Sequence, residues 1–324
     1  MPLSRRRFVN LSAGAALAPV TARFALAQSY PARAVRLLVG FPAGGPNDIL
    51  GRLIARWLTD RLGQPFAVEN MTGDAGNVAT AAAVRAPPDG YTLLLVGPSN
   101  AINGSLNDKL SFDFLRDIAP IAGLTREPLV MLVNPGVPAA SAPALIAYAK
   151  ANPGKLKLAL TDPGSAPHAT GELFRMMTGA EFELVRYGGG PAALKGTIEG
   201  KSELMFEPLS ASVEPLKSGK LRALAVTGAT PSPALPDLPT LGQSLPGFEA
   251  SAASGLGAPR ATPPEIVATL NQAVNAAFAD PDMRAHLAET GGTMLTGSPA
   301  DFGRLMAEET AKWAKVVKFT TGKQ

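Results

Sequence analysis

Short apolar runs alternate with segments of helical periodicity along the first hundred residues. Runs typical of buried strands lie at residues 35–41, 66–69 and 91–97. Apolar residues recur at helical spacing between the first two runs, at Leu50, Leu53, Ile54, Trp57 and Leu58. Gly63-Gln64-Pro65 predicts the end of this helix, and Pro87-Pro88-Asp89-Gly90 predicts a turn before the third strand. This region therefore predicts a β-α-β unit.

A second set of such runs predicts another α/β unit. Strand-like runs at residues 156–161, 182–187 and 203–206 are separated by helical stretches near residues 168–178, 191–199 and 211–218. Two β-rich segments, 129–133 and 221–227, lie between the units, and we expect each to cross from one unit to the other. We therefore expect two lobes, the first from residues 28–128 and 224–324 and the second from residues 129–223.

The last third of the chain predicts helices with marked starts. Thr262-Pro263-Pro264-Glu265 has the form of a capping box with prolines in the first turn, and Ser298-Pro299-Ala300-Asp301 is similar. The segment 230–248, which is rich in Pro, Ser and Gly, is typical of a surface excursion.

Residues 1–27 have the pattern of an export signal. Arginines at positions 5, 6 and 7 precede a mildly apolar run at residues 11–20, and Ala25-Leu26-Ala27 supplies a cleavage site after Ala27. Because the arginines adjoin Phe8, the twin-arginine route is favoured over the general route. No later segment has 18 uninterrupted apolar residues, so we expect a soluble mature protein in the periplasm.

Composition excludes several function classes. The 324 residues include no cysteine, which excludes disulfides, thiolate nucleophiles and cysteine-ligated metals, and they include only two histidines. The first 27 residues hold four of the 30 basic residues and none of the 26 acidic ones, so the mature chain carries 26 of each. We therefore expect no cofactor, no metal and no nucleic-acid partner, although counting does not exclude a carboxylate-rich metal site.

A glycine turn joins the first predicted strand to the first helix. In VRLLVGFPAGGPNDIL, residues 35–50, Gly44 and Gly45 offer unhindered backbone N–H groups that can converge on an anion with the positive helix end. Pro46 fixes the backbone, and we expect Asn47 or Asp48 to be the N-cap. The pattern is neither G-x-G-x-x-G nor a P-loop, which disfavours nucleotides.

A matching turn follows the first strand of the second unit. Residues 161–167, TDPGSAP, again link a strand to a helix and offer hydroxyls at Thr161 and Ser165. Glycine between strand and helix is common for geometric reasons, so either loop alone indicates little. Together they suggest two anion sites facing each other across a cleft, which would suit a dicarboxylate.

Several motifs span nearly all of the mature chain. They are Tyr30-Pro31 with VRLLVGFPAGGPND, VENMTGDAGNVA at 68–79, PDGYTLLL at 88–95, HATGELF at 168–174, KSGKLRALAVT at 217–227, LPDLPT at 235–240 and LPGFEA at 245–250. Together they resemble the substrate-binding receptors of tripartite tricarboxylate transporters, the Bug receptors. The resemblance implies an α/β, two-lobed periplasmic-binding-protein fold of the second type, each lobe a mixed β-sheet flanked by helices. It also implies a monomer that captures a small organic carboxylate in the cleft and delivers it to membrane permease subunits, without chemistry on the ligand.

The resemblance places the ligand-binding residues on loops of both lobes. Those of the first lobe are Phe41, Ala43, Gly44, Gly45, Asn47, Asp48, Ser99 and Asn100, and those of the second are Thr161, Asp162, Gly164, Ser165, His168, Tyr187 and Glu207. Backbone amides and bridging water are expected to supply much of the grip.

Departures from the family pattern bear on selectivity. Tyr187 is followed by Gly188-Gly189-Gly190 where relatives usually have a lysine, and residues 251–255 lack a frequent aromatic. Asp162 and Glu207 can both face the cleft, where acids are unfavourable beside a carboxylate unless the ligand also carries a cation or donor. We therefore expect a carboxylate that also bears an amine, amide or ring nitrogen, unless these acids are solvated caps.

Two other function classes share parts of this pattern. Ser165 and His168 lie three residues apart, but no G-x-S-x-G elbow accompanies them, so a hydrolase is disfavoured. His168 is more typical of a first-turn helix residue. A sensory receptor for a membrane signalling partner would use the same fold, and the sequence does not separate it from a transport receptor.

Overall fold

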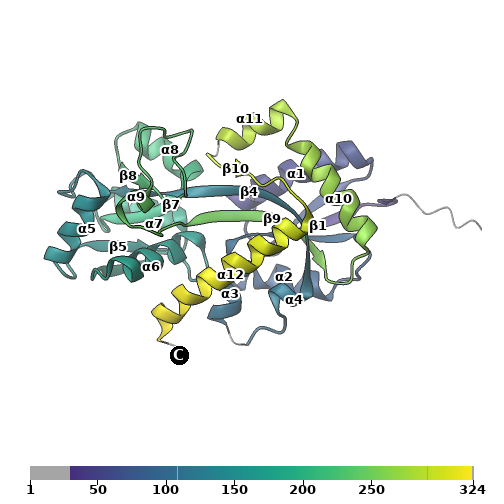
Figure 1. Cartoon of the computed structure of the whole chain (residues 1–324), viewed down its shortest axis with the longest axis horizontal. Helices are drawn as coiled ribbons and strands as arrows, with labels where there is room; N and C mark the ends of the chain where they lie inside the picture. Colours follow the sequence, from purple (N-terminus) through teal and green to yellow (C-terminus); the bar gives the residue numbers. More distant parts are fainter. Residues whose placement is uncertain (1–29, 108, 290, 323–324) are drawn as a thin grey trace, which may run out of the picture.

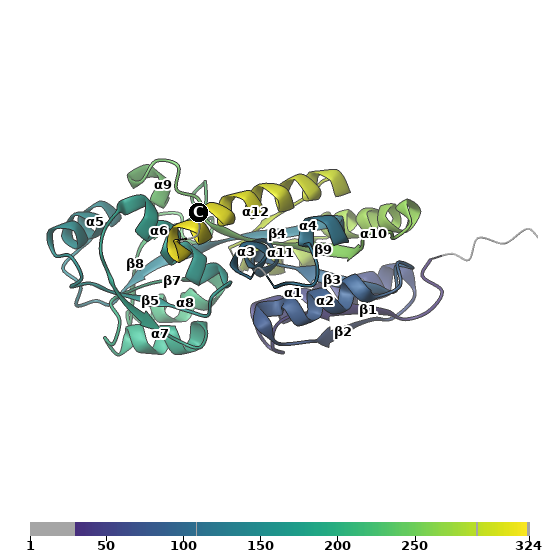
Figure 2. The same cartoon turned by 90° about the horizontal axis from the view of Figure 1, so that it is seen from below.

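Two lobes lie side by side along the longest axis of the molecule, joined by long central strands (Figures 1 and 2). The structure is a computed structural model that describes residues 30–107, 109–289 and 291–322, so the predicted leader at residues 1–27 lies outside the described residues. None of the described helices combines the length and apolar character needed to span a bilayer.

The first lobe contains the strand order β2-β1-β3-β9-β4. β1 (Val35–Val39) is parallel to β2 (Phe66–Asn70) and β3 (Thr92–Val96), and β9 (Ser251–Pro259) is antiparallel to β3 and to β4 (Ile118–Val133). The short β10 (Thr293–Met294) pairs with β4. The accompanying helices are α1 (Pro46–Leu62), η1 (Asp74–Gly76), α2 (Asn77–Arg85), α3 (Pro98–Leu106), α4 (Phe114–Asp117), α10 (Pro264–Ala277) and α11 (Pro281–Glu289).

Alternating side chains of β1 build a core on each face of this sheet. Leu37 packs with Ile54 of α1 and Leu270 of α10. Leu38 points to the other face, where it packs with Ala79 of α2 and with residues of the C-terminal helix. Because both faces are covered, every residue of β1 except the exposed Arg36 is apolar and buried.

The second lobe contains the order β8-β4-β7-β5-β6. β7 (Leu204–Pro208) and β8 (Arg222–Val226) are antiparallel to the second part of β4, whereas β5 (Lys157–Leu160) is parallel to β7 and to β6 (Glu183–Arg186). The helices are α5 (Ala142–Ala151), α6 (Ala166–Thr178), α7 (Gly190–Ile198), α8 (Leu209–Lys217) and α9 (Leu241–Ser244). The predicted helices at 168–178, 191–199 and 211–218 are confirmed as α6, α7 and α8.

The chain crosses between the lobes beside Thr227. β4 pairs with β9 as far as Pro128, and with β7 from Leu129 onward. The Leu129 N–H donates to Thr227 Oγ1 at 2.8 Å, and that hydroxyl donates to the Ala250 carbonyl at 2.6 Å. The two crossing segments are therefore fastened to each other by one buried threonine.

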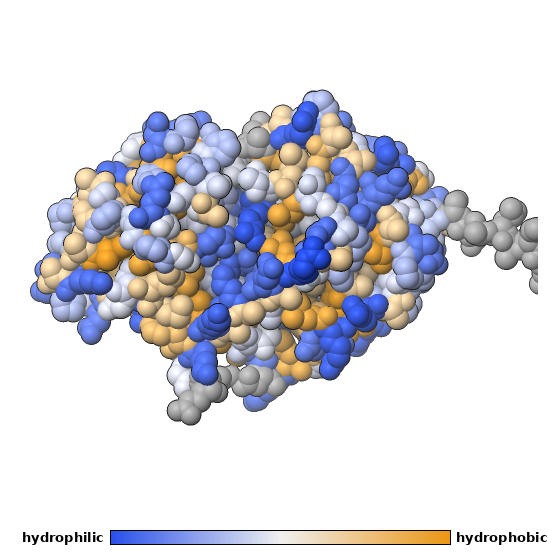
Figure 3. Space-filling view, in the orientation of Figure 1, coloured by the Kyte–Doolittle hydropathy of each residue, from blue (hydrophilic) through white to orange (hydrophobic). Residues whose placement is uncertain are grey.

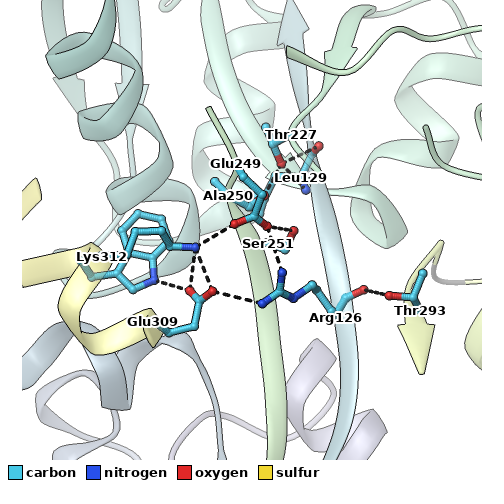
Figure 4. A network of polar contacts seen from close by, with 10 residues as sticks. Arg126, Leu129, Thr227, Glu249, Ala250, Ser251, Thr293, Glu309 and Lys312 are labelled. Carbon is cyan, nitrogen blue, oxygen red and sulfur yellow. Dashed lines mark hydrogen bonds and ion pairs between the residues drawn. The ribbon is translucent and has the colours of Figure 1, made fainter. Parts of the chain in front are cut away.

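A polar network lies next to this crossing (Figure 4). Arg126 of β4 lies 3.5 Å from Glu249 and 3.3 Å from Glu309, and Lys312 lies 3.0 Å and 2.8 Å from the same two carboxylates. Trp313 Nε1 donates to Glu309 at 2.9 Å. Hydrophilic residues gather between the lobes on the face shown in Figure 3. We call the polar network of Figure 4, formed by Arg126, Glu249, Glu309, Lys312 and Trp313, the crossing network.

The C-terminal helix α12 (Pro299–Thr321) contacts both lobes. Its first half contributes Phe302 and Met306 to a first-lobe core, and its second half contributes Trp313 and Val316 to the core that contains Phe206 of β7. Figure 1 shows this helix running obliquely across the face of the molecule. Motion of one lobe against the other must therefore change the packing of α12 on at least one of them.

Helix starts agree with the sequence in one place and differ in two. Ser298 and Asp301 form the predicted capping box of α12. The predicted N-caps of α1 were wrong, because α1 begins at Pro46 and its N-cap is Gly45; proline suits the first helical position, where its missing N–H costs nothing. The box at Thr262 was also wrong, since Pro263 is the N-cap of α10 and Thr262 instead bonds to the Pro259 carbonyl.

Candidate ligand-binding site

The side chain of Asp48 holds the β1–α1 turn in place through hydrogen bonds. Its carboxylate, on a residue 2% exposed, accepts from the Gly44 N–H at 2.8 Å, from Arg52 Nε at 2.9 Å and from Asn70 Nδ2 at 2.9 Å. The hydrogen bond from Arg52 is the main cause that lowers the pKa of Asp48 to about 2. Asp48 is thus an ionised brace for the turn, and Gly44 adopts the left-handed backbone, with φ of 81°, that the brace requires.

Three first-lobe loops meet at the carboxyl ends of β1, β2 and β3. A Cβ atom on Gly40 would lie 2.7 Å from the Cα of Gly76, so the first two loops touch through backbone alone. A Cβ on Gly76 would lie 3.6 Å from the Phe41 ring and 3.5 Å from Ser99 Oγ. Asn47 lies beside Gly97 in the third loop, 3.8 Å from where a Cβ would stand. The predicted residues Phe41, Asn47 and Ser99 are therefore brought together.

The loop between β2 and α2 has an unusual backbone that sequence reasoning did not single out. Residues 73–76 all have positive φ, including the non-glycines Asp74 at 46° and Ala75 at 50°. Such a conformation costs roughly 1–3 kcal/mol for each non-glycine residue. Asn103 offsets this cost by donating to the Ala75 carbonyl at 2.9 Å. The only signal in the sequence is the GDAGN segment within the second motif.

Asn100 holds the start of α3. Its Oδ1 accepts from the Gly97 N–H at 2.8 Å and its Nδ2 donates to Thr80 Oγ1 at 2.7 Å. Both polar ends of this buried amide are used inside the lobe. Asn100 therefore shapes the third loop. Its neighbour Ser99 is 2% exposed, and its side chain has no hydrogen bond of this kind within the described residues.

The β5–α6 loop of the second lobe is closed by two hydroxyls. Ser165 is the N-cap of α6 and its Oγ accepts from the His168 N–H at 3.3 Å. The same Oγ lies 2.6 Å from Thr161 Oγ1 and donates to the Asp162 carbonyl at 2.7 Å. Asp162 itself is exposed, and its Oδ2 lies 4.0 Å from the position of a Cβ on Gly189 in the next loop.

The loops of the two lobes touch at Gly164. A Cβ on Gly164 would lie 2.4 Å from Asn103 Oδ1 and 3.4 Å from the Cβ of Ala75. Asn103, buried at 5% exposure, thus supports the strained first-lobe turn with its amide nitrogen and meets the second lobe with its oxygen. Sequence reasoning missed Asn103, because nothing local marks a helical asparagine that acts across two lobes.

His168 points into a different environment from the loops. It lines a small cavity between α3, α6 and α12 together with Leu106, Glu172 and Trp313. Burial is the main cause that lowers the pKa of His168 to about 4, with smaller effects from Arg186 and Arg175. Its contact with Ser165 is made by the backbone N–H, so the pair is not arranged as a nucleophile and its base.

Tyr187 directly follows β6, and Glu207 is the penultimate residue of β7. The Tyr187 hydroxyl packs against Gly196 of α7 and bonds to Ser202 Oγ at 3.3 Å, so this side chain supports α7. Glu207 is 6% exposed, and its Oε2 has no hydrogen-bond partner among the described residues. Burial, with a smaller effect from Glu127, raises the pKa of Glu207 to about 8.

Metal ligation finds no support in the part of the chain that the structure describes. No three residues of the types His, Cys, Asp and Glu are grouped there in a way that could hold an ion. The chemistry of the site is that of backbone N–H groups, hydroxyls, amides and the two acids Asp162 and Glu207.

Known proteins resemble the chain in sequence and in fold. The family model described as tripartite tricarboxylate transporter family receptor matches residues 50–321. Protein BugT of Bordetella pertussis is 36% identical over 300 residues, which cover 92% of each chain. The solved structure of R. palustris Rpa4515 with adipate is 37% identical with a TM-score of 0.81, covering 89% of this chain and 97% of that one.

Two further solved structures resemble the chain in sequence and fold. MatC from Rhodopseudomonas palustris with bound malate is 32% identical with a TM-score of 0.77, covering 89% of this chain and all of that one. The periplasmic binding protein BugD is 30% identical with a TM-score of 0.78, covering 89% and 98%. These similarities confirm the predicted α/β periplasmic-binding-protein fold. The chain belongs to the tripartite tricarboxylate transporter receptor family, also called the Bug family, whose members are solute-binding receptors and not enzymes.

Proposed function

We propose that the chain is a periplasmic receptor that captures a small organic carboxylate between its lobes and delivers it to the permease subunits of a tripartite tricarboxylate transporter. The observation that carries the proposal is the meeting of first-lobe and second-lobe loops at Gly164, Ala75 and Asn103. A ligand held by both sets of loops would be enclosed. The adipate and malate bound by relatives supply the ligand class.

Uncapped helix starts are the main anion-binding elements in this proposal. The N-caps of α1 and α7 are Gly45 and Gly189, and neither helix has a side-chain cap. The N–H groups of their first turns therefore have no side-chain acceptor and can donate to a ligand oxygen. Asp48 and Asn100 belong to the site as supports for the loops, whereas Gly44, Gly45, Ser99, Gly164 and Ser165 are proposed to face the ligand.

Closure would occur by motion about the crossing segments. The hinges predicted from the sequence lie near residues 125–130 and 222–228, between a first lobe of residues 28–128 and 224–324 and a second lobe of residues 129–223. The return to the first lobe was expected too early, because α9 and Phe248 pack in the second-lobe core. We propose that the chain returns to the first lobe where β9 begins, at Ser251. The closed form is stabilised only to the extent that the ligand binds it better than the open form. Thr227 and the crossing network lie at these segments, so they are the contacts that must adapt.

A nitrogen-bearing carboxylate is the second candidate ligand. Asp162, which follows β5, and Glu207, near the end of β7, lie at the same edge of the second lobe, beside the glycines at the start of α7. If either acid is ionised when ligand binds, an ammonium or N–H donor on the ligand would pair with it. Matched pairs such as succinate with aspartate, or glutarate with glutamate, separate the two candidates.

The identity of the membrane partner distinguishes a transport receptor from a sensory receptor. A receptor of this fold could instead present its closed form to a membrane signalling protein. Affinity purification from detergent-solubilised membranes, with and without ligand, should recover permease subunits in a ligand-dependent way. Recovery of a sensor kinase in their place would favour the sensory alternative.

A thermal-shift screen tests the ligand class. The chain starting at Gln28 is refolded to remove carried ligand and then mixed with mono-, di- and tricarboxylates, amino acids, phosphate and nucleotides. Binding to the native state raises the melting temperature by mass action. The proposal predicts a shift confined to carboxylates, and a shift with phosphate or nucleotides alone would contradict it.

N-terminal sequencing of the exported protein tests cleavage after Ala27.

A further inference from the structure

Glu207 is a buried acid beside the loops of the second lobe. It stands at the carboxyl end of β7, level with the loops that follow β5 and β6. Only 6% of the residue is exposed, and Oε2 has no partner among the described residues. A buried polar atom without a partner costs about 1–3 kcal/mol, so its retention calls for an explanation.

The glycine run before α7 makes room for this carboxyl group. A Cβ on Gly190 would lie 2.5 Å from Glu207 Oε1 and 3.1 Å from its Cδ, so any larger residue at position 190 would displace the acid. Gly190 does not have positive φ, unlike Gly189 at 109°, so space and not backbone conformation explains the glycine. Gly190 and Glu207 are therefore a matched pair, with the acid against the uncapped start of α7.

Burial and a neighbouring acid disfavour the ionised form of Glu207, against the effect of the α7 helix start. Glu207 and Met205 share the sheet face covered by α7 and α8, whereas Phe206 faces α6. The acid that raises the pKa of Glu207 is Glu127 of β4, whose Oε1 accepts from Ser210 of α8 at 2.7 Å. Lys195 and Glu199 of α7 pair with each other at the surface, 3.9 Å apart. Asp162 and Glu214 are exposed acids on the β5–α6 loop and α8, respectively.

Burial and Glu127 together raise the pKa of Glu207 to about 8. At neutral pH the side chain therefore holds its proton, with an O–H that can donate. An uncharged acid does not repel a ligand carboxylate, which resolves the apparent conflict between an acid and an anion site.

We propose that Glu207 contacts the captured ligand as an uncharged carboxylic acid and donates its O–H to a ligand oxygen. The receptor would then select small acids that carry a second oxygen acceptor, such as a second carboxylate, over analogues with an ammonium group at that place. This inference rests on the proposed function and names the ligand group that its second lobe recognises.

The test is calorimetric titration at pH 6 to 9.5 with succinate, glutarate and adipate and with the amines aspartate and glutamate. For the dicarboxylate that binds, the affinity of the wild type should be constant below pH 8 and fall about tenfold per pH unit above it, because the proton must be restored. Glu207→Gln should bind without this fall, since its amide donates at every pH. Glu207→Leu should lose about ten- to a hundredfold in affinity, and Glu214→Gln, an exposed change on α8, should keep the wild-type profile.

Melting curves of each variant at pH 7 control for folding. Two results would overturn this inference while the proposed function stands, provided that carboxylates bind. They are a Glu207→Gln variant whose affinity falls above pH 8 as in the wild type, and a Glu207→Leu variant with full affinity. Tightest binding of an amine, lost in Glu207→Gln, would overturn it in favour of an ionised acid. Binding of no carboxylate would overturn both proposals.

Discussion

Gly164 of the second lobe lies against Asn103 of the first, with 2.4 Å between Asn103 Oδ1 and the place where a Cβ of residue 164 would stand. The same asparagine holds the strained turn at Ala75 through its amide nitrogen. One side chain thus joins the shape of a first-lobe loop to its contact with the second lobe.

Gly164→Ala should weaken ligand binding by at least tenfold. The added methyl group would meet Asn103 and Ala75, which hinders the approach of the lobes, and φ of 86° adds a backbone strain of about 1 kcal/mol. Gly179→Ala is the matched control, because Gly179 has φ of 62° but a Cβ there meets nothing within 4 Å. Calorimetry should show loss of affinity in the first variant only. Equal affinity in both would show that the Gly164 contact is not needed for capture.

Asp48→Ala should destabilise the first lobe by about 2–3 kcal/mol, since three donors lose their shared acceptor. The folded pKa of Asp48 is lowered to about 2, so its stabilisation is present above the ordinary pKa of 3.8 and is lost as the pH falls toward 2. Urea unfolding at pH 7 and pH 3 should show a smaller difference between variant and wild type at pH 3. Asp60→Asn, an exposed change on the same helix, should differ little from wild type at either pH.

Arg126→Met should lower the free energy of unfolding by about 1–2 kcal/mol, a value reduced by the partial exposure of the crossing network. Burial alone would raise the pKa of Glu249, but Lys312, Ser251 and Arg126 outweigh it and lower that pKa. This contribution is present above the ordinary glutamate pKa of about 4.3 and disappears as the pH falls through the lowered value. The cost of the substitution should therefore shrink in acid, whereas Lys315→Met, an exposed change on α12, should cost little at any pH.

His168→Leu should remove a pH dependence of stability. The folded pKa of His168 is lowered from 6.5 to about 4, so the unfolded chain binds more protons between these values and wild-type stability falls as the pH decreases from 6.5 to 4. One such group contributes a slope of up to about 1.4 kcal/mol per pH unit. Thermal unfolding between pH 4 and pH 7 should show a shallower slope in the variant. An unchanged slope would mean that His168 binds its proton equally well in the folded and the unfolded chain.

The apolar pattern predicts much of the fold because covered strands and amphipathic helices carry local signals. β1, α1 and α6 are readable in this way, with Gly63 and Gly179 as their helix stops. The first part of β4 was missed because Pro120, Gly123 and charged residues interrupt its apolar run. The segment 230–248 was expected at the surface, yet Leu241 and Phe248 are buried in the second-lobe core.

The site was less accessible to sequence reasoning for a physical reason. The turns at Gly44 and Ser165 are local, so their glycine and cap residues can be recognised. The brace from Asn70 to Asp48 spans 22 residues, and the contact between Asn103 and Gly164 joins two lobes. Such pairs depend on how the strands are ordered, which no local pattern encodes.

Small-angle scattering of the ligand-free mature chain, before and after saturation with the carboxylate identified by the thermal-shift screen, measures directly whether the two lobes close on the ligand. Capture between two lobes predicts a smaller radius of gyration with ligand, and no change for Gly164→Ala at the same ligand concentration. Binding proven by calorimetry without any compaction of the wild type would contradict capture by closure of the two lobes.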